Sequence, residues 1–286
     1  MKIAAAVILY NPDKTTASKI RSYANSVEKV YLLDNSEEND TYLQELLNSL
    51  EGINLTYLHD GENRGIAARL NQACKLAIQE GFAWLLTMDQ DSFFSDQMLD
   101  QYLHCCATYT QLNKVAQFGI TYVNKEEHKD LCVTKDVRQL ITSGCLVNLN
   151  LFTQIEGFDE NLFIDQVDFD YCYKAILKGY KLVQFPNIYM EHSLGNTSTH
   201  ISLLSFKKTQ RSLHSPLRLY YMVRNYLYMD HKYDQHFLLE IKHSKKDVLN
   251  RIKNNLLYGK QRFATLKYII AGVKDYKEGR MGKYKR

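Results

Sequence analysis

The sequence predicts an α/β protein, with a mostly parallel central sheet flanked by helices and a basic helical extension at the C-terminus. Short apolar runs alternate with amphipathic stretches along residues 3–185, which is the pattern of successive strand–helix units. The chain has 286 residues, of which 45% are hydrophobic, so it can bury a large core. Residues 207–286 hold 20 Lys and Arg against 6 Asp and Glu, a net charge of +14, whereas residues 1–206 carry −10.

This charge asymmetry predicts a body at 1–206 and a helical region at 207–286, with different partners. No apolar run approaches the length of a membrane span, and no signal peptide is recognised. The six cysteines show no metal-ligand spacing, so we expect reduced, mostly buried thiols. These features predict a cytoplasmic protein.

The individual elements follow from periodicity and from the turn residues that end them. Each strand is a short apolar run, and the first two end at the turn signals Asn11-Pro12 and Asp34-Asn35. Each helix has apolar residues at helical spacing. The expected strands are 3–10, 29–33, 53–58, 84–88, 116–123, 139–147 and 181–185. The expected helices are 15–26, 42–50, an Ala-rich helix that follows the polar turn within 62–71 and ends at about 79, 97–112 and 171–178, then one from 216, 237–257 and 260–277.

The strand at 84–88 ends in two aspartates, Asp89 and Asp91, separated by one residue. Side chains two residues apart in an extended backbone point the same way, so both carboxylates project from the end of this strand. Ligands of open α/β sheets bind outside the carboxyl ends of the strands. Two carboxylates there can hold a divalent cation, which can hold phosphate oxygens. The alternative is a solvated loop after a core strand.

Further polar residues follow the other strands of the first half. If the strands are neighbours, Asn11, Asp34 and Asn63 lie with Asp89 at one sheet edge, where a nucleotide fits. Asp34 could accept from a base or ribose, and the amides near Gly65 at a helix start could meet phosphate. The alternative is that these are turn residues and helix caps. No Gly-x-Gly-x-x-Gly or Walker lysine loop is present, which disfavours dinucleotide-binding and P-loop proteins.

A second acidic cluster spans 165–170 and precedes the helix expected at 171–178. Helix capping explains one of its three aspartates. It does not explain why three acidic residues stand among apolar neighbours. A carboxylate in a partly apolar cleft is a candidate general base, so catalysis and capping both remain open for Asp168. His192 ends a later strand before a glycine-containing loop, where it is either structural or a metal ligand together with Asp91.

The C-terminal region is rich in tyrosine, arginine and lysine, and its expected helices alternate apolar and basic residues. Such helices can lie on an anionic membrane surface. The alternative is that they pack on the body or form a homodimer. No nucleic-acid partner is predicted.

Taken together and in chain order, these motifs resemble the inverting GT-A-fold glycosyltransferases of family 2, and within them the bacterial rhamnosyltransferase-like branch. The resemblance covers residues 3–225. Its motifs are Leu9-Tyr10-Asn11-Pro12, Leu33-Asp34-Asn35, Asn63-Arg64-Gly65-Ile66-Ala67, Asp89-Gln90-Asp91-Ser92, Ser143-Gly144, Phe163-Ile164-Asp165-Gln166-Val167-Asp168, His192 and Tyr220-Tyr221-x-x-Arg224-Asn225.

The resemblance implies transfer of a sugar from a nucleotide-diphosphate donor to a hydroxyl of a lipid-linked saccharide acceptor in bacterial surface polysaccharide synthesis. It implies that Asp91 and His192 hold Mn²⁺ or Mg²⁺ and that Asp168 is the general base. The donor-binding residues would be Tyr10, Asn11, Asp34, Asn63, Gly65, Arg69, Asp89 and Gln90. The acceptor-side residues would be Ser143, Gly144, Asp165, Tyr221 and Arg224. The protein would then be peripheral on the inner face of the cell membrane.

The sequence departs from the branch's pattern at two points. Its Asp-x-Glu-Trp becomes Asp168-Phe169-Asp170-Tyr171, and the usual arginine becomes Lys174. The donor is therefore open between dTDP-L-rhamnose, a UDP-hexose and a galactofuranose donor. A sugar nucleotidyltransferase would carry a glycine-rich basic loop near its N-terminus, which Leu9-Tyr10-Asn11-Pro12 is not. A non-catalytic carbohydrate- or membrane-binding module would not need Asp91, Asp168 and His192.

Overall fold

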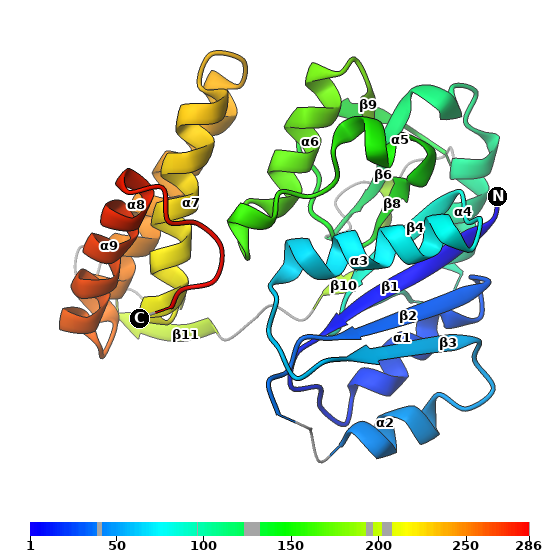
Figure 1. The fold of residues 1–286 in the computed structure, drawn as a ribbon, viewed down its shortest axis with the longest axis horizontal. Coiled ribbons are helices and arrows are strands. Elements are labelled where there is room, and N and C mark those ends of the chain that lie inside the picture. The colour runs from blue at the N-terminus through cyan, green and yellow to red at the C-terminus, as the bar shows by residue number, and fades with distance from the viewer. Residues whose placement is uncertain (39–41, 96, 123–131, 193–196, 202–207, 286) are drawn as a thin grey trace. The chain divides into compact units, whose positions relative to one another are not determined.

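A computed structural model describes residues 1–38, 42–95, 97–122, 132–192, 197–201 and 208–285; from 192 to 212 it describes only backbone. The chain divides into two compact units (Figure 1). The first unit comprises residues 1–160 and 167–193, and the second comprises 161–166 and 194–286. This division passes to the second unit after residue 193, while the domain boundary at 206 stays a prediction. Six residues from the middle of the chain, 161–166, also belong to the second unit.

The first unit contains the expected parallel sheet, extended by antiparallel strands. The strand order is β3-β2-β1-β4-β8-β6-β9-β7. The four strands β3, β2, β1 and β4 are parallel to one another, and β6 is parallel to β9, whereas β8 and β7 run antiparallel to their neighbours. The bounds are β1 Ile3–Leu9, β2 Lys29–Asp34, β3 Leu55–His59, β4 Trp84–Asp89, β6 Val115–Thr121, β7 Lys135–Val137, β8 Cys145–Asn148 and β9 Lys181–Tyr189.

Helices cover both faces of this sheet. The alternate β1 residues Ile3, Ala5, Val7 and Leu9 are buried in one core with side chains of α1, α2 and α4. Helix α3 packs across β1, β2 and β4 (Figure 1). The helices of this unit are α1 Thr16–Ala24, α2 Leu43–Ser49, α3 Ile66–Gln79, α4 Met98–Thr108, α5 Leu149–Ile155 and α6 Val167–Leu177. The short strands β5 Ser92–Phe93 and β10 Glu191–His192 form a separate antiparallel pair.

The second unit is a three-helix assembly with one hairpin. Its helices are α7 Pro216–Tyr233, α8 Leu238–Tyr258 and α9 Arg262–Lys277, and the hairpin strands are β11 Thr197–Ile201 and β12 Lys208–Ser212. Ser215 caps α7 by accepting from the backbone N–H of Arg218, and Pro216 occupies the first turn, where its missing N–H costs nothing. Helix α9 packs closely on α7 at Gly272. A Cβ added there would lie 2.8 Å from the carbonyl oxygen of Tyr220, so only glycine fits without a shift.

Three sequence expectations are corrected by the structure. The strand expected at 139–147 is confined to β8, and α5, which follows it at once, was not anticipated. The helix expected at 171–178 begins at Val167, so both Asp168 and Asp170 lie in its first turn. Cys105 and Cys132 form a disulfide with Cα atoms 5.2 Å apart, so the expectation of six reduced thiols is wrong for this pair.

The spacing of 27 residues between these two cysteines carries no pairing signal, because only the fold brings them together. Cys74, Cys106 and Cys145 are buried free thiols, as is Cys172. Disulfides are rare in cytosolic proteins, so the cysteines no longer support a cytoplasmic location. None of the helices in the described ranges is long and apolar enough to cross a membrane.

Candidate active site

The parallel strands β1, β2 and β4 bring the predicted donor-binding motifs to one sheet edge. In the sheet register, Leu9 of β1 is opposite Asp34 of β2, and Ile8 is opposite Asp89 of β4. The residues that follow these strands therefore leave the same edge side by side. The condition that the sequence left open, that these strands are neighbours, is met.

The turn after β2 is closed by hydrogen bonds to its own side chains. Asp34 is buried, and its carboxylate accepts from the backbone N–H of Ser36 and from the Tyr57 hydroxyl, both at 2.8 Å. Burial, with the bond to Asp34 second, raises the pKa of Tyr57 well above its ordinary value, so Tyr57 remains a donor. The Ser36 hydroxyl accepts from the backbone N–H of Asn11 at 2.8 Å, which ties the β1 turn to the β2 turn.

Arg69 is committed to the protein rather than to a ligand. It is 1% exposed and makes two hydrogen bonds to the Asp60 carboxylate, at 2.6 and 3.2 Å. These bonds are the main reason that the pKa of Asp60 is lowered. Arg69 also donates to the Asn35 side-chain oxygen, which accepts from the backbone N–H of Arg64 as well. Arg69 thus supports the loop before α3, and its donor-binding role stays a prediction.

That loop delivers the start of α3 to the site. The Asn63 side chain accepts from the backbone N–H of Gly65 at 3.1 Å. Gly65 has a φ of +83° and directly precedes the first residue of α3, Ile66. A side chain at this φ would be strained, so glycine is required for the chain to turn into the helix here. The free amides of the first helical turn remain suited to an anionic group.

The Asp89-Gln90-Asp91 turn is held from both sides. Gln90 pairs with the backbone of Tyr10, accepting from its N–H at 2.8 Å and donating to its carbonyl oxygen at 3.0 Å. The buried Ser143 hydroxyl accepts from the backbone N–H of Asp89 and donates to the Ser92 hydroxyl, both at 3.0 Å. Asp89 is exposed and Asp91 half-buried, so both can reach a ligand.

Ser143 therefore supports the acidic turn, and the acceptor-side role of Ser143 and Gly144 stays a prediction. Gly144 has a φ of +72°, and a Cβ there would lie 2.9 Å from the Ile120 side chain. Its backbone N–H donates to the Thr87 carbonyl oxygen at 2.8 Å. The side chain that lies closest to Gly144 is thus Ile120, a residue of the protein's own core.

His192 is brought to the acidic turn by strand pairing. In the β5–β10 pair, His192 lies opposite Ser92, the residue that follows Asp91. The His192 side chain lies outside the described residues. Backbone register therefore pairs His192 with the residue that directly follows Asp91, and the shared metal ion stays a prediction. Within the described part of the chain, no cluster of three or more potential metal-binding side chains is found.

Asp168 belongs to the same region as Asp89. Burial is the main cause of the raised pKa of Tyr122, and the charges of Cys145, Asp89 and Asp168 add to it. Both carboxylates therefore act on one phenol, whose hydroxyl donates to the Ser143 carbonyl oxygen at 2.5 Å. Asp168 is half-buried and accepts from the backbone N–H of Phe169 at 3.0 Å. It thus lies in the first turn of α6, where it accepts a backbone hydrogen bond, and also near the acidic turn.

Asp170 is a structural residue. Its side chain is 0% exposed and pairs with Lys174, one turn later, at 2.9 Å. Lys174 also donates to the Gly157 carbonyl oxygen at 2.5 Å. Two of the three residues that depart from the family pattern, Asp170 and Lys174, are therefore paired with each other inside the fold.

The remaining predicted acceptor residues are all held within the second unit. Asp165 pairs with Arg218 at 2.6 Å. Arg224 is fully buried and donates to the Gly282 carbonyl oxygen at 2.8 Å. The Tyr221 hydroxyl accepts from the backbone N–H of Tyr284, at 2.9 Å.

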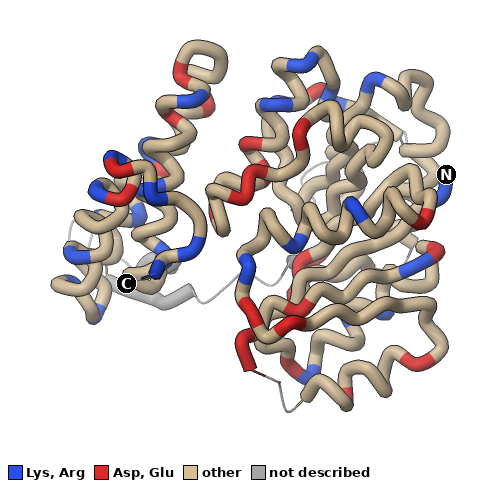
Figure 2. Tube along the Cα trace, in the orientation of Figure 1, with Lys and Arg blue, Asp and Glu red and all other residues tan. Residues whose placement is uncertain are grey.

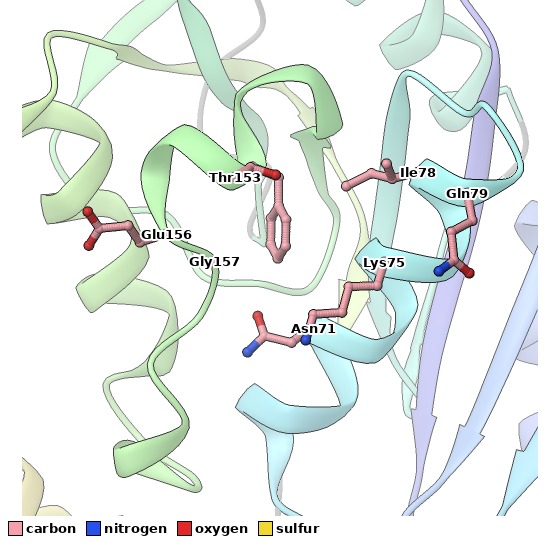
Figure 3. Close-up of a pocket in the computed structure, with 8 residues that line it drawn as sticks. Asn71, Lys75, Ile78, Gln79, Thr153, Glu156 and Gly157 are labelled. Carbon is pink, nitrogen blue, oxygen red and sulfur yellow. The ribbon is translucent and has the colours of Figure 1, made fainter.

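Several residues of this site were missed by sequence reasoning. Asn35 and Ser36 directly follow Asp34, so their proximity in sequence was an available signal. Tyr57 and Tyr122 are two of 21 tyrosines, and only the strand arrangement singles them out. An open pocket between α3 and α5, lined by Asn71, Lys75, Ile78, Gln79, Phe152, Thr153, Glu156 and Gly157, contains none of the predicted site residues (Figure 3).

Comparison with known proteins identifies the first part of the chain. Residues 5–131 match the sequence profile of glycosyl transferase family 2. This segment therefore resembles the family 2 glycosyltransferases in sequence. A curated relative, the dTDP-rhamnosyl transferase RfbF of Shigella flexneri, is 25% identical over 277 residues, covering 91% of this chain and 89% of the relative. The family resemblance inferred from the motifs is confirmed.

Solved structures confirm that the family 2 domain has the GT-A fold. The mannosyltransferase PcManGT from Pyrobaculum calidifontis, in complex with GDP-Man and Mn²⁺, superposes with a TM-score of 0.57 at 13% identity, covering 98% of this chain and 83% of that one. S. aureus TarS 1–349, in complex with UDP-GlcNAc, superposes with a TM-score of 0.56 at 16% identity, covering 96% and 80%. At these identities the likeness concerns the fold alone.

Proposed function

We propose that the protein is a divalent-cation-dependent, inverting glycosyltransferase that moves L-rhamnose from dTDP-rhamnose to a hydroxyl of a saccharide acceptor in bacterial surface polysaccharide synthesis. The observation that carries this proposal is the match to a dTDP-rhamnosyl transferase over 91% of the chain, which spans both units. The same chemistry with a UDP-hexose or a galactofuranose donor is the second candidate, because Asp168-Phe169-Asp170-Tyr171 departs from the rhamnosyltransferase-like pattern.

The donor set at the acidic turn fits Mn²⁺ or Mg²⁺. Asp91 supplies a carboxylate, and the strand register brings His192 opposite the next residue, Ser92. Carboxylate suits both ions, and imidazole favours Mn²⁺ over Mg²⁺. A cation bound there would offset the negative charge that develops on the departing nucleoside diphosphate. Asp34 and Asp89 would bind the nucleoside, and the first turn of α3 after Gly65 would face the diphosphate.

Asp168 is the proposed general base. It would accept the proton of the acceptor hydroxyl as that oxygen forms a bond to the anomeric carbon of the sugar. The bond from the anomeric carbon to the diphosphate oxygen breaks on the opposite face, and its electron pair leaves with the nucleoside diphosphate. A single in-line displacement inverts the anomeric centre. Asp170 cannot take this role, since its buried carboxylate pairs with Lys174.

A donor panel tests this proposal directly. The purified protein is incubated with Mn²⁺ and, separately, with dTDP-rhamnose, UDP-galactofuranose and UDP-hexoses, and released nucleoside diphosphate is measured with and without a saccharide acceptor. We expect dTDP from dTDP-rhamnose to be released fastest. Preference for a UDP-sugar would replace the donor but keep the reaction. Turnover of none of them, with pyrophosphate formed instead from a nucleoside triphosphate and a sugar phosphate, would identify a nucleotidyltransferase.

We also propose that the second unit attaches the protein to an anionic membrane surface, where a lipid-linked acceptor would be presented. Lys and Arg are spread along α8 and α9 (Figure 2). On α9, Phe263 is 91%, Leu266 45% and Ile270 66% exposed, and Lys267 and Lys274 are exposed on the same face. Three apolar side chains between basic ones match the interface of a peripheral helix with anionic lipid. The opposite face of α9 packs on α7 through Gly272.

Vesicle sedimentation tests the attachment. The full-length protein should pellet with vesicles containing phosphatidylglycerol at low salt and less so at high salt, because salt screens surface charge. Phe263→Ser combined with Ile270→Ser should abolish pelleting, whereas Leu177→Ser, at a 50% exposed leucine of the first unit, should not. Failure of the unaltered protein to pellet, with a dimer observed in solution, would show instead that this face forms a homodimer.

A further inference from the structure

The loop at 161–166 combines a strained backbone with a fixed position in the second unit. Phe163, Asp165 and Gln166 have φ values of 58°, 68° and 68°. None of them is glycine, and the left-handed region is sparsely populated by other residues. Three such residues among four persist only when the surroundings hold them in place.

Asn225 of α7 holds the loop by its main chain. Its side-chain amide is fully buried and donates to the carbonyl oxygens of Leu162 and Ile164, each at 2.7 Å, and of Asp165 at 3.0 Å. One NH₂ group thus meets three carbonyls of a single turn. The Leu162 carbonyl also accepts from the backbone N–H of Ile164 at 2.6 Å, and residues 163–166 belong to no helix or strand. The side-chain oxygen of Asn225 accepts from the Arg224 guanidinium at 3.1 Å, which fixes the orientation of the amide.

Neighbouring residues of α7 hold the loop by its side chains. The Tyr221 ring stacks on Phe163 with centroids 5.2 Å apart. Arg218 pairs with Asp165 at 2.6 Å. Arg224, itself fully buried, also reaches the loop's first carbonyl oxygen at 3.4 Å.

We propose that the motif Tyr220-Tyr221-x-x-Arg224-Asn225, with Arg218, is a clamp that holds the 161–166 loop and so determines where α6 begins and where Asp168 is placed. The loop ends at Gln166, which is bonded to the first residue of α6, and Asp168 lies in that first turn. These are positioning residues, since they act through the loop. The proposal rests on the proposed role of Asp168, and it assigns this motif a part in transfer without contact to an acceptor.

The other end of the loop is also anchored, which leaves the clamp to set its shape. The Asn71 amide donates to the Phe158 carbonyl oxygen at 2.9 Å and to the Glu160 carboxylate at 2.8 Å, and its oxygen accepts from the Phe158 N–H at 2.8 Å. This bond anchors residue 160, so the six residues that follow run from an anchored start to the first residue of α6. Release of the clamp would free the loop to relax toward ordinary φ values and to shift or fray the first turn of α6.

The experiment compares Asn225→Ala and Arg218→Gln with a control on the same helix, His231→Ala, whose side chain is exposed. We expect kcat for transfer, per folded molecule, to fall roughly 10- to 100-fold in Asn225→Ala, because small misplacements of a catalytic group have effects of this size. Arg218→Gln removes a half-exposed side chain and should fold normally, with a smaller fall in kcat. The KM for the donor should stay within about twofold in both, because the predicted donor residues belong to the first unit. A fall in kcat with an unchanged KM is a result that loss of fold would not produce.

Hydrogen exchange of residues 161–169 provides a readout that does not need activity. Exchange in this segment should accelerate in Asn225→Ala and Arg218→Gln and stay unchanged in His231→Ala. Unchanged exchange in both clamp variants would overturn the clamp, whether or not the protein transfers sugar. Accelerated exchange with an undiminished kcat would overturn the link to Asp168. If the unaltered protein turns over no donor while exchange responds as expected, the proposed function fails and the clamp stands.

Discussion

Replacing Asp168 by asparagine separates its two roles, general base and helix cap. The change keeps the size of the side chain and an oxygen that can accept from the Phe169 N–H, at 3.0 Å in the native protein. It removes the negative charge and the ability to take up a proton. A base and a cap therefore predict opposite results from a single substitution.

The expected loss of stability is small. An exposed or half-buried carboxylate in the first turn of a helix contributes about 0.3–1 kcal/mol through the helix dipole. A loss of about 1 kcal/mol lowers the melting temperature of a domain of this size by about 2–4 °C. The expected loss of activity is far larger, since removal of a general base lowers the rate about 10²- to 10⁴-fold.

Asp170→Asn is the matched control, because it makes the same change two residues later in the same turn. Asp170 is 0% exposed and pairs with Lys174, and breaking a buried ion pair costs about 3–5 kcal/mol. This variant should therefore melt much earlier but keep its turnover per folded molecule. Melting by circular dichroism and release of nucleoside diphosphate at a temperature where both variants are folded give the two quantities.

The reasoning is refuted if Asp168→Asn transfers sugar within a few-fold of the native rate. It is also refuted if its lost activity follows the loss of folded protein, as capping alone would require. Retained binding of nucleotide diphosphate by the inactive variant would confirm that only the proton-accepting step is affected.

Two further predictions concern the acidic turn. EDTA should abolish transfer and Mn²⁺ or Mg²⁺ should restore it, and Asp91→Asn should raise the cation concentration needed for half-maximal activity; full activity in excess chelator would exclude a metal at this turn. Ser143→Ala should lower the free energy of unfolding by about 1–3 kcal/mol, because it leaves the Asp89 N–H without its acceptor. It should also raise the KM for the donor, whereas an unchanged KM would show that the turn keeps its shape without this bond.

The parallel half of the fold was readable from the sequence because its strands β1, β2 and β4 are almost wholly buried and end in polar turn residues. Ile3–Leu9 and Trp84–Asp89 are continuous apolar runs of this kind. The antiparallel part was harder, since β7 is only three residues long and β8 is followed at once by α5. The insertion of 161–166 into the second unit depends on side chains more than 50 residues away, and no local pattern reports it.

The site was predicted in outline for the same reason. Parallel strands leave one edge together, so residues after β1, β2 and β4 were expected to meet, and they do. Local reasoning could not distinguish residues that face a ligand from residues that hold the ligand-facing ones in place. Arg69 and Ser143 carry groups suited to binding, yet both are buried and bonded to their own chain.

The route of the chain imposes an order on folding. Residues 161–166 lie between strands and helices of the first unit, but their hydrogen-bond partners, Asn225, Arg224 and Arg218, are synthesised some fifty residues later. The sheet can form as soon as its strands emerge, since domains fold largely in the order of synthesis. The loop must wait, with its carbonyls solvated, until α7 exists. The turn that leads to Asp168 is thus completed only after α7, the helix that holds it, has been made. The proposed base therefore reaches its final position late in folding.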